Sequence, residues 1–87
     1  MDKTIFSTEY VRFLGLLRQI REQAGLTQVE LAQRLHTTQS FISKCERGDR
    51  RIDIVELRAF CTAMGISLMQ FVEIFEVQAP RPQDPLV

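Results

Sequence analysis

The chain has 87 residues, of which 45% are hydrophobic and 25% are charged, and its formal net charge is zero. This length allows one compact domain with a single modest core and excludes two domains. The neutral total conceals an uneven distribution, because residues 34–51 carry a net charge of plus three and the residues from 52 onward carry minus three. The basic middle keeps nucleic acid open as a partner, although DNA-binding proteins are usually basic overall.

The sequence contains no segment suited to crossing a bilayer. The longest apolar-rich stretch, ISLMQFVEIFEV, is interrupted by Gln70, Glu73 and Glu76, and the N-terminus lacks the charged-then-apolar pattern of a signal peptide. We therefore expect a cytoplasmic protein without a membrane partner.

The first predicted helix starts near Ser7 and spans residues 8–24, after a flexible N-terminus at residues 1–6. Apolar residues recur in it at the spacing of an amphipathic helix, and they are Tyr10, Phe13 or Leu14, Leu17 and Ile20. Gly25 follows and ends the helix at low energetic cost, because glycine readily adopts a positive φ. This helix is expected to place one apolar face on the core.

Three further helices begin with one local pattern, found at LTQVEL (26–31), IDIVEL (52–57) and ISLMQF (66–71). In each, a Thr, Asp or Ser can cap the helix, and a Glu or Gln three residues later can bond back to the cap. With stops at Gly48 and Gly65, these signals predict helices over 28–35, 39–47, 54–64 and 68–76. No segment alternates with period two, so the predicted fold class is all-α, a compact bundle of five helices. The tail at 78–87 has three prolines and is expected to be disordered or an extended arm.

The sequence offers no metal, cofactor or catalytic site. Cys45 and Cys61 lack zinc-site spacing, and a fourfold ligand set would need more than the single histidine, His36. We interpret both thiols as buried and reduced, acting as small apolar side chains. No set of nucleophile, base and orienting group converges on one place, so we expect neither a cofactor nor an enzyme.

Helices 28–35 and 39–47 are joined by only three residues, 36–38, which forces them to cross at a steep angle. Ile42 and Cys45 can bury one side of the second helix. Its other side carries polar residues suited to base edges, with a basic residue at the end: Gln39, Ser40, Ser43, Lys44 and Arg47. An ordinary exposed helix can carry such residues too, so the pattern alone leaves both interpretations open.

The stretch LTQVELAQRLHTTQSFISKCERG resembles the helix-turn-helix of the Cro/C1-type, or XRE-like, phage and bacterial repressors. The resemblance covers about residues 12–76 and implies a lambda-repressor-like DNA-binding domain over residues 7–77, with residues 39–47 as the recognition helix in the major groove. The implied base contacts are Gln39, Ser40, Ser43 and Lys44, and the implied phosphate contacts are Gln28, Thr38, Arg47, Arg50 and Arg51. Gln28 is also expected to brace Gln39. Arg21 matches the family position that pairs with Glu46, a pair that either locks the first helix to the third or is two solvated charges.

Three positions depart from the family pattern. His36 stands where a glycine is common, so either it adopts a positive φ, at a cost on the order of 1 kcal/mol, or the turn shifts. Phe41 replaces a small residue and either meets a thymine methyl group or covers the edge of helix 28–35 or a gap in the core. Cys45 replaces a larger aliphatic residue and leaves a slightly smaller core plug.

Family members commonly bind two half-sites as dimers, and the last helix is the candidate dimer interface. Apolar residues surround it more fully than one core-facing stripe requires. We predict a homodimer interface formed by Leu68, Phe71, Val72 and Phe75; the alternative is that the first helix covers this patch.

The expected function is therefore a transcriptional regulator, specifically a repressor that binds a palindromic operator on double-stranded DNA as a homodimer. A DNA-binding antitoxin of a toxin-antitoxin pair is the first alternative, in which the last helix or the tail would bind a protein partner. A protein-interaction module of the same fold is the second.

Overall fold

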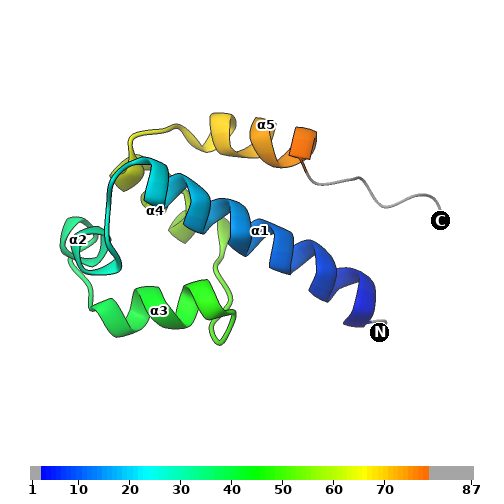
Figure 1. Ribbon diagram of the computed structural model, residues 1–87, viewed down its shortest axis with the longest axis horizontal. Coiled ribbons are helices and arrows are strands. Elements are labelled where there is room, and N and C mark those ends of the chain that lie inside the picture. Colours follow the sequence, from blue (N-terminus) through cyan, green and yellow to red (C-terminus); the bar gives the residue numbers. More distant parts are fainter. Residues whose placement is uncertain (1–2, 79–87) are drawn as a thin grey trace.

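The computed structural model describes residues 3–78, and five α-helices account for most of them. They are α1 (Lys3–Gln23), α2 (Gln28–Arg34), α3 (Gln39–Arg47), α4 (Ile54–Met64) and α5 (Leu68–Gln78) (Figure 1). Within residues 3–78 there is no strand, which confirms the all-α prediction. In Figure 1, α3 and α5 lie on opposite edges of the molecule, with α1 between them.

The two ends of the domain differ from the predicted bounds. The backbone is already helical at Lys3, so Ser7 does not start a helix and the flexible segment expected at 1–6 overlaps α1. No glycine or proline lies in residues 3–7, so nothing local stops the helix there. At the other end α5 includes Gln78, and the rest of the predicted tail, 79–87, lies outside the described residues, as do residues 1 and 2.

The predicted helix starts are present as reciprocal hydrogen bonds. The backbone N–H of Glu30 donates to Thr27 Oγ1 at 3.1 Å, and the N–H of Thr27 donates to Glu30 Oε1 at 2.9 Å. The same pair of bonds joins Asp53 with Glu56 at 2.7 and 3.0 Å. Ser67 and Gln70 repeat it at 3.0 and 2.8 Å. Because these bonds use only neighbouring residues, they could be predicted without knowledge of the packing.

His36 adopts a φ of 56°, so the turn between α2 and α3 keeps its left-handed residue without a glycine. This settles the alternative left open by the sequence in favour of a positive φ. The backbone N–H of the next residue, Thr37, donates to the carbonyl oxygen of Ala32 at 2.9 Å and closes the end of α2.

We expect His36→Gly to raise the free energy of unfolding by about 0.5–1 kcal/mol, because glycine adopts this conformation without a Cβ clash. The imidazole is exposed, so little packing is lost. Urea denaturation of the two chains measures the change. His36→Val is the control and should destabilise the protein, since a β-branched residue tolerates a positive φ poorly. A His36→Gly variant less stable than the natural chain would show that the turn carries no strain.

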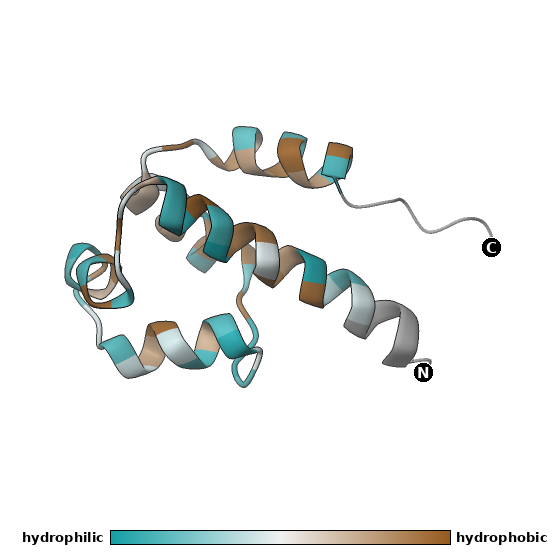
Figure 2. Ribbon diagram, in the orientation of Figure 1, coloured by the Kyte–Doolittle hydropathy of each residue, from teal (hydrophilic) through white to brown (hydrophobic). Residues whose placement is uncertain are grey.

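The core lies where the five helices meet. Its fully buried side chains come from every helix and are Leu17, Leu31, Ile42, Cys45, Phe60, Cys61 and Phe71. Apolar residues recur along α1, α4 and α5 in Figure 2, whereas α3 is largely hydrophilic or neutral. Both cysteines are free, and burial raises the pKa of each thiol, so they pack as neutral apolar groups. Among the described residues, no cluster of three metal-ligating side chains occurs.

No single helix in the described chain is long and apolar enough to span a membrane. Taken together, α4 and α5 reach the required length and composition, but their axes bend by 101° at the break between them.

Candidate nucleic-acid interface

Helix α3 presents a polar outer face because its two fully buried apolar residues lie on the opposite side. Ile42 and Cys45 are fully buried against the core. Thr38 caps the start of the helix, where its side chain accepts a hydrogen bond from the N–H of Phe41 at 3.1 Å. Gly48 caps the end with a φ of 84°. Its place at the edge of the molecule leaves the outer face open (Figure 1).

The four predicted base-contact residues do not share one environment. Gln39, Ser40 and Lys44 are exposed on the outer face. Ser43 is half-buried, and its hydroxyl accepts a hydrogen bond from Arg47 Nη1 at 2.6 Å. In this structure Ser43 therefore holds the side chain of Arg47 and is less available to a base than the other three.

A buried ion pair joins α1 to α3. Arg21 Nε donates to Glu46 Oε2 at 2.6 Å, and Arg21 Nη2 donates to Glu46 Oε1 at 3.1 Å. The side chains are only 9% and 6% exposed, so the alternative of two solvated charges does not apply. Arg21 Nη1 also donates to the carbonyl oxygen of Leu26 at 2.7 Å, which ties the pair to the start of α2.

The ion pair continues outward as a chain of side-chain hydrogen bonds. Gln28 Nε2 donates to Glu46 Oε1 at 2.9 Å. Gln39 Nε2 in turn donates to Gln28 Oε1 at 3.2 Å, which is the contact expected between these two glutamines. The chain leads from the buried side of α1 to the exposed start of α3. The link between Glu46 and Gln28 was not predicted, because 18 residues separate them and no local pattern connects them.

Two of the three arginines implied as phosphate contacts form ion pairs with neighbouring carboxylates. Arg47 donates from Nη2 to Asp49 Oδ2 at 2.9 Å. Arg50 Nη2 donates to Glu56 Oε2 at 2.8 Å, and this bond holds the pKa of the Glu56 carboxyl below its usual range. The resemblance implied phosphate contacts for these arginines, and their pairing with Asp49 and Glu56 was not predicted. The opposite charge of nearby residues was the only available signal.

Two arginines in the loop after α3 pack against aromatic rings. The guanidinium carbon of Arg50 lies 4.8 Å from the ring centre of Phe41, and that of Arg51 lies 4.4 Å from the ring centre of Tyr10. Phe41 itself is half-buried, with its ring centre 6.5 Å from that of Phe60. Phe41 therefore fills the edge of the core rather than pointing toward a DNA groove, which answers the question of its orientation.

One of the four residues predicted to form the dimer surface on α5 is buried in the core. Phe71 is 1% exposed and packs edge-on against Phe13 of α1, with ring centres 5.7 Å apart, so its side chain is not available to a partner. Its position in the inward stripe of α5 is the physical reason. Phe13 also contacts Phe75, with ring centres 6.3 Å apart, so α1 covers part of the patch. The strongly exposed apolar residues on α5 are Met69, Val72 and Val77.

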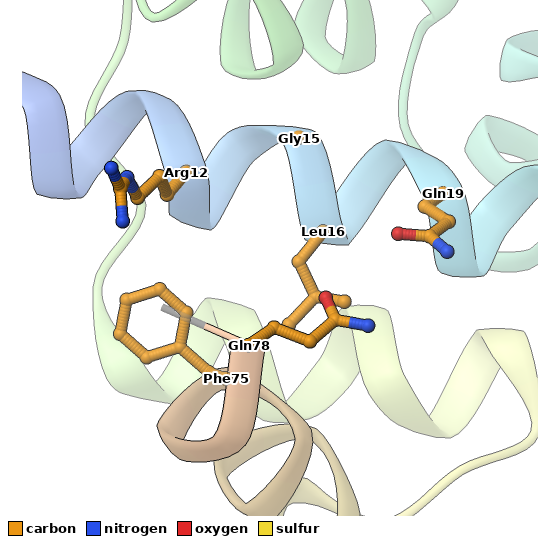
Figure 3. A pocket seen from close by; sticks show the side chains of 6 residues that line it. All are labelled: Arg12, Gly15, Leu16, Gln19, Phe75 and Gln78. Carbon is orange, nitrogen blue, oxygen red and sulfur yellow. The ribbon is translucent and has the colours of Figure 1, made fainter. Parts of the chain in front are cut away.

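A pocket lies between α1 and α5. It is lined by Arg12, Gly15, Leu16, Gln19, Phe75 and Gln78. Figure 3 shows Arg12 and Gln19 on α1 flanking Leu16, with Phe75 and Gln78 facing them from α5. The pocket thus combines apolar and polar lining residues, and Val11, next to Arg12 on α1, is 66% exposed.

Comparisons with known proteins agree with this arrangement. The helix-turn-helix domain family matches residues 12–70. The chain is 34% identical over 53 residues to the uncharacterized HTH-type transcriptional regulator y4dJ of Sinorhizobium fredii, a stretch covering 61% of this chain and 69% of that protein. It also resembles the solved structure of an XRE-family like protein from Pseudomonas syringae pv. tomato, with a TM-score of 0.82 and 41% identity over 90% of this chain and 95% of that chain.

Proposed function

We propose that this chain, which belongs to the XRE-like helix-turn-helix family, binds a specific site on double-stranded DNA and represses transcription there. The observation that carries the proposal is the exposed outer face of α3, with Gln39, Ser40 and Lys44 on a helix anchored by the buried pair of Arg21 and Glu46. A rigid helix with exposed donors and acceptors is what major-groove reading requires.

The chemistry of the exposed residues suggests how bases are read. The amide of Gln39 suits adenine, which offers one donor and one acceptor in the major groove, and the ammonium of Lys44 suits the acceptors of guanine. Ser40 can donate or accept and therefore adds contact with less discrimination. Ser43 is a weaker candidate, because Arg47 already binds its hydroxyl.

Phosphate contacts surround this face in the proposal. Gln28 and Thr38 lie at the starts of α2 and α3, where free backbone N–H groups favour an anion. Arg47 is the last residue of α3, and Arg50 and Arg51 lie in the loop that follows it. The ion pairs that hold Arg47 and Arg50 are exposed, and exposed pairs contribute little to stability, so exchanging a carboxylate for a DNA phosphate costs little.

The proposal includes a homodimer formed through α5 and the adjoining part of α1. Met69 is 81% exposed and Val72 is 44% exposed, and both belong to α5, which lies on the edge of the molecule opposite α3 (Figure 1). Leu68 and Phe75 are half-buried on the same helix. In the proposed dimer each copy of α3 contacts one half-site, which predicts a palindromic operator. Occupation of a promoter by such a dimer would exclude the polymerase, which is the proposed route to repression.

Selection of duplexes from a random pool tests the function directly. The natural chain should enrich one palindromic sequence, and a reporter gene with that sequence in its promoter should be repressed when the chain is expressed. Enrichment of no sequence would contradict sequence-specific binding, and enrichment of a site without internal symmetry would contradict the dimer.

Two substitutions should separate base reading from phosphate binding. Lys44→Ala is expected to relax the preference at one base pair in each half-site by about 1–3 kcal/mol, because it removes a base contact. Arg51→Ala is expected to weaken binding to all sequences and to lower the slope of log K against log salt by about one for each protomer. Binding isotherms at several salt concentrations on matched and substituted duplexes measure both. An equal loss on every duplex for Lys44→Ala would make Lys44 a phosphate contact.

A further inference from the structure

The direction of the Gln39 amide depends on Gln28, a residue of α2. An ionised carboxylate only accepts hydrogen bonds, so the Gln28 amide must turn its Nε2 toward Glu46 Oε1, 2.9 Å away. If that amide were reversed, two acceptor oxygens would face each other and the charge-assisted bond would be lost. The orientation of Gln28 therefore follows from the charge of Glu46.

The orientation of the Gln28 amide in turn fixes that of the Gln39 amide. Because Nε2 of Gln28 donates to Glu46, Oε1 of Gln28 faces Gln39 and can only accept a hydrogen bond. Gln39 must therefore direct its Nε2 toward Gln28, and this Nε2 donates to Gln28 Oε1 at 3.2 Å. One N–H and the carbonyl oxygen of Gln39 then remain for DNA. A donor beside an acceptor matches N7 and N6 of adenine, whereas guanine presents two acceptors, N7 and O6, and would meet the carbonyl oxygen unfavourably.

The ion pair between Arg21 and Glu46 fixes the position of the Glu46 carboxylate and thereby the direction of the two amides. Arg21 occupies both oxygens of Glu46, and the two side chains are 9% and 6% exposed, so water cannot easily replace either partner. The bond from Gln28 to Glu46 is partly buried, while the bond from Gln39 to Gln28 is exposed. A fixed charge in the interior thus controls an amide on the surface through a single intervening residue.

We propose that Glu46 is a positioning residue for recognition: through Gln28 it sets the polarity of the Gln39 amide and makes Gln39 prefer adenine to guanine. The inference rests on the proposed DNA-binding function and adds a specificity role for residues whose other role is to join α1 to α3.

Gln28→Lys tests the proposal because it reverses the direction of the hydrogen bond with Gln39 and keeps a donor for Glu46. Lysine can donate to Glu46 and retains attraction for phosphate, but it offers Gln39 a donor in place of an acceptor. Gln39 should then turn its carbonyl oxygen toward the new ammonium group and present its N–H groups to the base. On duplexes that differ by adenine or guanine at single positions, the natural chain should prefer adenine on the order of 10- to 100-fold at one base pair of each half-site. The variant should lose that preference to within about threefold or reverse it toward guanine. The ratio of the two affinities is the readout, because Gln28 is also a proposed phosphate contact and its replacement changes the affinity for both duplexes.

Gln33→Lys is the matched control, since it adds the same charge to the exposed surface of α2, and the side chain of Gln33 takes no part in the chain of hydrogen bonds from Glu46 to Gln39. It should leave the adenine preference unchanged. Glu46→Gln probes the origin of the polarity, because an amide can present either a donor or an acceptor to Gln28, and it should also weaken the preference if it folds. If Glu46→Gln does not fold, Gln28→Lys alone decides.

The outcomes separate the proposed function from the inference built on it. A natural chain that selects no sequence overturns the proposed function and the inference with it. A natural chain that selects adenine, with a Gln28→Lys variant that keeps the same preference, overturns the inference alone. A folded Glu46→Gln variant with unchanged preference would likewise show that the charge of Glu46 does not set the polarity.

Discussion

Replacing Arg21 with methionine is expected to lower the free energy of unfolding by about 3–5 kcal/mol, because it leaves the carboxylate of Glu46 buried without its cation. The side chain of Glu46 is only 6% exposed, so water cannot solvate the remaining charge well. The carbonyl oxygen of Leu26 also loses its 2.7 Å bond from Arg21 Nη1. For a domain of this size such a loss is a large part of the total stability. Chemical denaturation of the two chains measures it.

Two comparisons show whether the loss comes from the unpaired charge. Removing both charges with Arg21→Met and Glu46→Leu should recover most of the lost stability, because no buried charge remains. Arg18→Met breaks the exposed pair of Arg18 with Glu22, whose side chains are 65% and 56% exposed, and should cost less than about 1 kcal/mol. Equal losses for Arg21→Met and Arg18→Met would contradict a structural role for the buried pair. The doubly substituted chain should be stable yet less selective, since Gln28 then lacks the acceptor that orients it.

Val72→Asp is expected to lower affinity for a full operator by about 10²- to 10⁴-fold while binding to a single half-site changes little. Across a two-fold interface each copy presents the same surface, so the substitution places two new carboxylates near each other and near Glu73 of both chains. The side chain is 44% exposed in the single chain, so the fold should tolerate the change. Sedimentation measures the loss of the dimer, and titration of full and half sites measures the loss of avidity.

Val55→Asp is the matched control for this prediction. Val55 is 75% exposed on α4 and does not line the pocket between α1 and α5. The control should leave the oligomeric state unchanged. If Val72→Asp also leaves it unchanged, the exposed face of α5 is not the dimer surface.

Much of the fold could be predicted because its signals are local. The bonds of Thr27 with Glu30 and of Asp53 with Glu56 join residues three apart, and the positive φ values at Gly48 and Gly65 follow from the backbone freedom of glycine. These features located the starts of α2 and α4 and the ends of α3 and α4. The start of α1 was missed because Ser7 offers a possible cap, and a possible cap does not oblige a helix to begin there.

In the candidate site too, some features could be predicted from local patterns and others could not. The exposure of Gln39, Ser40 and Lys44 follows from helical periodicity once Ile42 and Cys45 face the core. The partners of Arg47 and Arg50 do not follow from periodicity, because flexible side chains choose among several nearby carboxylates.

By itself the sequence determined the five helices, their caps, the inward and outward faces of α3 and the likeness to XRE-like repressors, since each depends on residues a few positions apart. Only the tertiary structure decided that Phe71 belongs to the core and that the ring of Phe41 packs against Arg50. It also decided that Gln28 links Glu46 to Gln39 by hydrogen bonds. Those contacts join different helices, or a helix and a loop, and their geometry is set by how these segments pack against one another, which no local pattern specifies.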